Sequence, residues 1–293
     1  MDMKKKANNN VYKSDYSKEN LPKTRREQFW RLLKDNFFTL MKLGLILLVL
    51  MIPFLTAIVM KNVNLSYVYN NADLSEIDKT RNIASINIIF SAIYIPCIML
   101  FFLGLGGILK VLRRLIWDEP LFFKEDFFLG IKENIGQFLL FGFLIGFITF
   151  LNVLAYQSTY GWAKYLSYVM IGVSFALIIP IIVTAGYISS IYKNKISVSF
   201  SVSMKLFIRR GIFIILILLF LYSTYFLSWL KISVIIYLAI LFVLIILLFP
   251  VWLLISFMNC IKNLDDYVNV YYYPENAYLG LFVANKQQNR KEQ

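Results

Sequence analysis

Acidic side chains are the residues of this chain that could carry acid–base or metal chemistry. The chain has 17 Asp and Glu, two Cys and no His, so the commonest metal ligand and the usual general base near neutral pH are both missing. One acidic pair, Asp265 and Asp266, stands close to Lys262, and this pattern is typical of a solvated helix end. We therefore expect no catalytic residue, no cofactor and no metal site, and a protein that is not an enzyme.

The apolar stretches of the chain contain no carboxylate at all. Coupled carriers usually keep an ionisable group at membrane depth, and no Gly-rich nucleotide cradle ending in Lys-Ser/Thr occurs either. Two interpretations of the scattered polar residues stay open: hydrogen bonds between helices, worth about 0.6 kcal/mol each, or the lining of a narrow polar path. These residues are Asn87, Thr149, Asn152, Ser174, Thr184, Ser223 and Thr224.

Six long apolar stretches must position these side chains. Hydrophobic residues make up 59% of the 293 residues, charged residues only 16%, and the mean hydropathy is +0.65. Each stretch is continuously apolar and long enough to cross ~30 Å of hydrocarbon as an α-helix, whereas a barrel strand would alternate. The predicted spans cover residues 37–60, 83–109, 135–156, 165–190, 211–230 and 232–258.

The basic residues predict how these spans are oriented. Of the 30 Lys and Arg, 24 fall in segments on one side of the predicted spans and five on the other. Because Lys and Arg stay on the cytoplasmic side during insertion, we expect a plasma-membrane protein with both termini in the cytoplasm. The polar N-terminal segment has no cleavable signal pattern and is expected to be retained. Anionic lipids attract such cations by roughly 1 kcal/mol each, so the expected partner is the lipid bilayer and not nucleic acid.

The spans share a repeating layout. Pro96, Pro180 and Pro250 lie 14, 13 and 12 residues before a lysine at the cytoplasmic end of their spans, which predicts a kink near mid-membrane. A mixed aromatic and charged segment precedes each odd-numbered span. The pattern predicts three helical hairpins, each preceded by a cytoplasmic interfacial amphipathic helix. The expected organisation is a basic, flexible segment at 1–28, a transmembrane domain at 29–262 and a cytoplasmic tail at 263–293.

The middle interfacial segment is the best defined of the three. Asp118, Glu119 and Pro120 suit the first turn of a helix, and four apolar residues, Phe123, Phe127, Phe128 and Ile131, then share one face. Two interpretations remain: an ordinary anchor at the membrane surface, or a coupling helix that docks a partner.

The same region carries a resemblance to a known family. Three small residues end the second span, an acidic pair follows at Asp118 and Glu119, and an aromatic and polar set precedes the third span: Gly104, Gly106, Gly107, then Phe127, Phe128, Gly130, Lys132 and Asn134. This arrangement resembles the YesL-like family of bacterial integral membrane proteins, a domain family of unknown function. The resemblance implies an accessory role beside sugar uptake or polysaccharide utilisation systems.

These considerations lead to one leading hypothesis and two alternatives. We expect a non-enzymatic membrane protein that is an accessory to carbohydrate uptake, with another membrane protein or a sugar importer as partner. The alternatives are an uncoupled transporter or channel for a small solute, and a lipid-handling protein. The candidate partner or interfacial contacts are Trp117, Asp118, Phe127, Phe128, Lys132 and Asn134.

Overall fold

The protein is helical throughout the part of the chain that the computed structural model describes, which is residues 21–157, 161–192, 194–211, 240 and 242–282. Five helical runs there are long and apolar enough to cross a membrane, which confirms the all-α prediction and five of the predicted apolar spans at this level. The fifth predicted span, with Ser223 and Thr224, lies outside the described residues except for Gly211.

The elements of the described residues follow one another along the chain in a simple order. They are α1 (Arg25–Asp35), α2 (Phe37–Asn70), α3 (Glu76–Ile116), α4 (Phe123–Tyr156), α5 (Gly161–Val173), the π-helical turn η2 (Ser174–Ile178), α6 (Ile179–Ile191), a helix over residues 196–211, the π-helical turn η3 (Leu244–Leu248), α9 (Phe249–Leu264), the π-helical turn η4 (Asp265–Asn269), α10 (Val270–Tyr272) and the 3-10 turn η5 (Pro274–Asn276).

Side-chain caps mark where two of these helices begin. Thr24 precedes α1 and its hydroxyl accepts a hydrogen bond from the backbone N–H of Glu27 at 3.2 Å. Ser75 caps α3 in the same way through the N–H of Asp78, also at 3.2 Å. Each cap satisfies an N–H that has no partner within its helix.

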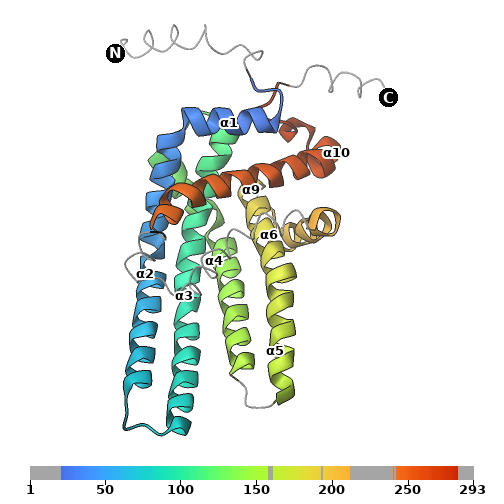
Figure 1. Cartoon of the computed structure of the whole chain (residues 1–293). Helices are drawn as coiled ribbons and strands as arrows, with labels where there is room; N and C mark the ends of the chain where they lie inside the picture. Colours follow the sequence, from blue (N-terminus) through green and yellow to red (C-terminus); the bar gives the residue numbers. More distant parts are fainter. Residues whose placement is uncertain (1–20, 158–160, 193, 212–239, 241, 283–293) are drawn as a thin grey trace.

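Four long helical segments form the body of the molecule. Figure 1 shows α2, α3, α4 and the α5–α6 segment running alternately down and up, side by side. At 1.5 Å per residue, the 34 residues of α2 and the 41 residues of α3 extend about 50 and 60 Å, so both are longer than ~30 Å of hydrocarbon. Their polar ends therefore reach beyond the apolar layer.

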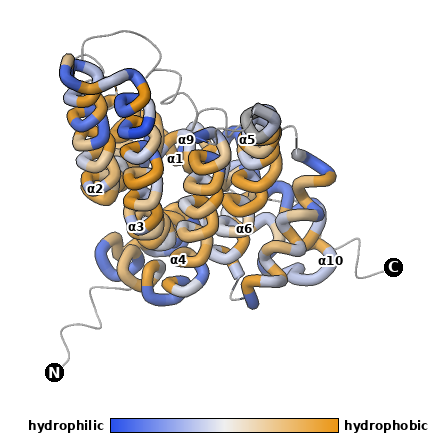
Figure 2. Tube along the Cα trace, turned by 90° about the horizontal axis from the view of Figure 1, so that it is seen from below, coloured by the Kyte–Doolittle hydropathy of each residue, from blue (hydrophilic) through white to orange (hydrophobic). Residues whose placement is uncertain are grey.

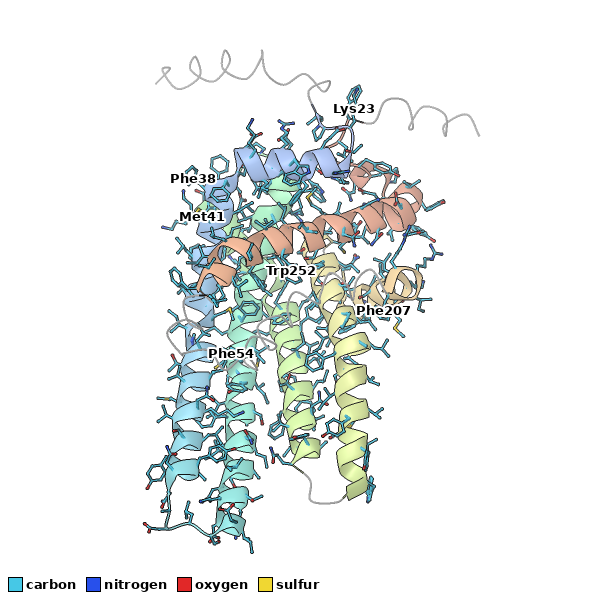
Figure 3. The ribbon with its side chains drawn as sticks, in the orientation of Figure 1. Lys23, Phe38, Met41, Phe54, Phe207 and Trp252 are labelled. Carbon is cyan, nitrogen blue, oxygen red and sulfur yellow. The ribbon has the colours of Figure 1, made fainter. Side chains whose placement is uncertain are left out.

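The apolar surface of these helices faces outward. In their most hydrophobic windows, only 22 to 28% of the residues are buried inside the protein. Figure 2 shows hydrophobic residues along the long helices and hydrophilic residues gathered at the turn between α2 and α3. Side chains such as Phe38 project away from α2 (Figure 3). Outward apolar surface of this extent suits lipid as the surrounding solvent.

The last helical run differs from the other four. In the Leu244–Tyr272 run, 61% of the most hydrophobic window is buried. Figure 1 shows this run passing obliquely across α2, α3 and α6 near one end of the bundle. It touches α2 closely, because a side chain added at Gly44 would collide with the carbonyl oxygen of Ile246. The predicted domain boundary at 262/263 falls inside this continuous run.

Two of the predicted kink prolines lie beside irregular helix. Pro180 and Pro250 each follow a π-helical turn, η2 and η3 respectively, whereas Pro96 lies inside α3. Proline lacks an N–H, and a π-helical turn lets the neighbouring backbone rearrange its hydrogen bonds.

Candidate functional site at the charged end

Polar and charged side chains are concentrated at one end of the bundle. We call this the charged end, and define it by α1, the last turns of α3, the first turns of α4, the end of α6, the helix over 196–211 and the η4–η5 segment. Figure 1 shows both described chain ends there, and the N–H of Phe282 donates to the carbonyl of Pro22 at 3.0 Å.

Glycines bring the backbones of α3 and α4 together at this end. A side chain at Gly107 would lie 2.7 Å from the carbonyl oxygen of Phe127, and one at Gly130 would lie 2.5 Å from Cβ of Lys110. Both distances are too short for a real Cβ atom. The two helices therefore pack through bare backbone, which places their charged residues opposite one another.

Ion pairs then join the two helices. Lys110 Nζ lies 2.7 Å from Glu133 Oε2, and Arg114 Nε lies 2.8 Å from Asp126 Oδ1. Lys110 and Asp126 are both buried, and Asp126 also accepts the backbone N–H of Phe122 at 2.8 Å, at the start of α4. These cations are neutralised inside the protein, and removing one partner would leave a buried charge unpaired.

Arg113 connects the end of α3 to the end of α6. Its Nη1 donates to the carbonyl of Ser190 at 2.9 Å, and its guanidinium lies 4.9 Å from the centre of the Trp117 ring. Gln137 on α4 adds a hydrogen bond from Nε2 to the carbonyl of Asn194 at 2.8 Å. The last carbonyls of a helix lack partners of their own, so Arg113 satisfies one of them at the end of α6. Gln137 holds the connection that follows α6.

A second polar cluster, which we call the polar clasp, joins α1 to η4 and to the segment after it. Asp265 is almost completely buried and receives three donors: Arg25 Nη2 at 2.6 Å, Asn269 Nδ2 at 2.9 Å and the N–H of Tyr278 at 3.2 Å. The prediction that Asp265 lies at a solvated helix end is wrong, although its neighbour Asp266 is exposed. The carboxylate is buried because Arg25, 240 residues earlier, pairs with it.

Gln28 extends the clasp to α3. Its Nε2 donates to the carbonyls of Ile116 and Gly280, and the side chain is 3% exposed. Gly280 has φ 77°, and a side chain there would collide with the Ile116 carbonyl. Only glycine suits this position, because it combines a left-handed backbone with a close approach.

Tyr192, just beyond α6, completes the cluster. Its hydroxyl donates to Asn269 Oδ1, and its ring lies 5.4 Å from the ring of Tyr273. Burial raises the pKa of Tyr192 above the ordinary tyrosine value. The clasp therefore ties α1, α3, α6 and η4 into one unit.

The six predicted contact residues all lie at the charged end but in different surroundings. Trp117 and Asp118 are half-buried in the turn after α3, and Asp118 has φ 56°. Phe127 and Asn134 are buried, and Asn134 has non-helical backbone angles (φ −127°, ψ 17°) within α4. Phe128 and Lys132 are exposed. Of the six residues, a partner could therefore reach Phe128 and Lys132 fully, and Trp117 and Asp118 in part.

Sequence reasoning missed the residues of the polar clasp. A signal for them was present, because Asp265 and Asn269 continue a row of buried residues spaced by four, after Phe257 and Ile261. Such a row lies on one face of a helix. A polar residue that continues an apolar row is a candidate for a buried, paired group.

These features define the class of protein: a membrane-embedded, multi-pass helical protein with a densely cross-linked charged end. Comparison with protein families, with curated proteins and with solved structures finds no match to this chain. Among the described residues, no group of His, Cys, Asp and Glu could hold a metal ion.

Proposed function

We propose that the protein is a non-enzymatic component of the bacterial plasma membrane that serves another membrane protein as an accessory. In this proposal the charged end faces the cytoplasm, as the distribution of Lys and Arg indicates. The resemblance to the YesL-like family supports carbohydrate uptake as the process served.

The observation that carries the proposal is the way α4 presents Phe128 and Lys132. The two residues are four apart, so they share one face of the helix, and Phe128 is 58% exposed. The helix beneath them is held to α3 by the Gly107 and Gly130 contacts and by the Lys110 ion pair. A rigid, exposed aromatic residue beside a cation suits a protein partner, because little conformational entropy is lost on binding.

The test is affinity purification of the tagged protein in mild detergent, with and without supplied sugars. We expect a membrane protein to be retained, and Phe128→Ala combined with Lys132→Glu to reduce its retention about thirtyfold, the effect of an anchor worth ~2 kcal/mol. The matched control is Phe143→Ala with Lys34→Glu, which makes the same two changes at exposed residues of α4 and α1 away from this face. The accessory role is refuted if the protein is purified alone under every condition, or if the control variant loses the partner equally.

A second candidate, an uncoupled transporter or channel, is favoured by one observation. Asn152 Nδ2 donates to Ser174 Oγ at 3.2 Å within the apolar region, while its Oδ1 is buried and has no partner among the described residues. Ser174 also begins the π-helical turn η2, a type of irregularity that is frequent at functional sites. Solute flux into proteoliposomes tests this candidate: Asn152→Leu should change the flux, and Ser91→Ala, a buried polar change on α3 whose hydroxyl bonds within its own helix, should not.

A further inference from the structure

The helix over residues 196–211 has two chemically different faces. One face packs against α6: the hydroxyl of Ser189 donates to Ser199 Oγ at 3.0 Å, and the hydroxyl of Ser203 donates to the carbonyl of Ile181 at 2.6 Å. Leu206 is buried on the same face. This helix is therefore firmly attached to the bundle through small side chains and hydrogen bonds.

The opposite face is exposed and combines apolar and basic residues. Met204 and Ile208 are exposed, Ile208 to 75%, and Lys205 and Arg209 stand beside them at the same four-residue spacing. Figure 1 draws this helix nearly end-on beside α6, while α5 and α6 run lengthwise, and Figure 3 marks it by Phe207. In a bilayer crossed by α5 and α6, the helix lies roughly parallel to the membrane plane, as interfacial helices do.

The charge of this segment is not balanced internally. Residues 194–211 contain four basic residues and no Asp or Glu, whereas residues 110–133 contain five basic and five acidic residues. Ion pairs neutralise Lys110 and Arg114 of the second segment. The 194–211 segment therefore attracts anionic lipid more strongly than residues 110–133 do.

Arg209 is pre-positioned for an anion. Its guanidinium carbon lies 4.7 Å from the centre of the Tyr267 ring, on the neighbouring η4 turn. Stacking uses the flat face of the guanidinium and leaves the N–H groups at its edge available. No carboxylate of the described residues forms an ion pair with it. The fork of N–H donors fits the two free oxygens of a phosphodiester.

We propose that the exposed face of this helix is a binding site for an anionic phospholipid. Arg209, held on Tyr267, binds the lipid phosphate together with Lys205, while Met204 and Ile208 enter the upper part of the acyl layer. Arg210, exposed near the end of the described part of the helix, adds positive charge beside this site. This inference rests on the membrane placement of the proposed function but not on the accessory role, because the lipid site and the Phe128–Lys132 face use different residues.

The test is titration of dye-labelled phosphatidylglycerol into the purified full chain in neutral detergent, followed by fluorescence anisotropy, with dye-labelled phosphatidylcholine as the uncharged lipid. Replacing Lys205, Arg209 and Arg210 by Gln should weaken phosphatidylglycerol binding about a hundredfold, since each cation near the lipid surface contributes roughly fivefold. The matched control, Arg26→Gln with Lys34→Gln and Lys124→Gln, removes the same charge from exposed positions elsewhere. It should bind as the wild type does.

Tyr267→Leu distinguishes a specific binding site from non-specific electrostatic attraction, because it removes the ring beneath Arg209 and keeps every cation. We expect the affinity for phosphatidylglycerol to fall severalfold.

The proposal is overturned if the two triple variants weaken binding equally, if phosphatidylcholine binds as tightly as phosphatidylglycerol, or if inorganic phosphate displaces the lipid completely. Failure of the partner purification with retained lipid selectivity would refute only the accessory role. The Lys205→Gln and Arg210→Gln double variant repeats the test should the triple variant not fold.

Discussion

Asp265→Ala should open the charged end of the protein locally. The carboxylate accepts Arg25, Asn269 and the N–H of Tyr278, and it is 1% exposed while Arg25 is 11% exposed. Removing one partner of a buried ion pair costs about 3–5 kcal/mol, because the remaining charge stays buried without compensation. At 1.4 kcal/mol per factor of ten, the opened state becomes about a hundredfold to three-thousandfold more populated.

Maleimide labelling of Cys260 measures this opening. Cys260 is buried in α9, little more than one turn before Asp265, so it reacts only when the segment separates. Cys97 on α3 is buried as well and reports global unfolding. Asp266→Ala is the matched control, because Asp266 is exposed and its hydrogen bond from the Tyr278 hydroxyl is long, at 3.4 Å. Exposed substitutions of this kind change stability by less than about 0.5 kcal/mol.

Equal labelling of Cys260 in the Asp265→Ala and Asp266→Ala variants would refute the reasoning, as would parallel acceleration at Cys97. Asp265→Asn should give an intermediate rate, because the amide keeps an acceptor oxygen but loses the charge that compensates Arg25.

Two further predictions concern packing and pH. Gly130→Ala should lower the midpoint of thermal unfolding in detergent, because its Cβ would lie 2.5 Å from Cβ of Lys110, while Gly136→Ala on the same helix meets nothing within 4 Å and should be neutral or slightly stabilising. Equal midpoints for the two variants would contradict the close α3–α4 contact. Burial raises the pKa of Tyr192 in the folded protein. Its contribution to the free energy of unfolding is therefore complete below the ordinary tyrosine pKa of about 10. The contribution declines as the pH rises further, because the unfolded chain releases the proton at a lower pH than the folded protein does. Tyr192→Phe should flatten the alkaline fall of the unfolding midpoint; a fall as steep as in the wild type would exclude this tyrosine as its source.

Helix positions were predictable from the sequence because their cause is local. A run such as residues 37–60 has to be apolar over its whole length to lie in hydrocarbon, and a helix alone satisfies its backbone there. The structure extends that helix to Asn70 and the second to Ile116. Charged and amide side chains interrupt the apolar pattern in the extra turns, so the hydropathy pattern marks the span and not the end of the helix.

The surroundings of individual residues at the charged end were only partly predictable. Phe127 and Phe128 are adjacent and chemically identical, yet Phe127 is buried against Gly107 and Phe128 is exposed. The helical period placed both on one apolar face, but the close approach of α3 decided which of them is covered. Membrane helices pack through such details of shape, and the period of one helix contains no information about its neighbour.

The amino-acid sequence by itself determined that the chain is helical, that its long helices are suited to lipid, and that its cations lie mainly beside one end of the apolar runs. These properties follow from the free energy of transferring each residue from water to hydrocarbon. That free energy depends on the type of residue and not on its neighbours in the fold. Only the tertiary structure decided that Asp265 is buried with Arg25, that Lys110 is neutralised by Glu133, and that the guanidinium of Arg209 lies over the ring of Tyr267. A charge acquires its role from partners far away in the chain, because electrostatic energy depends on distance in space and not on separation in sequence.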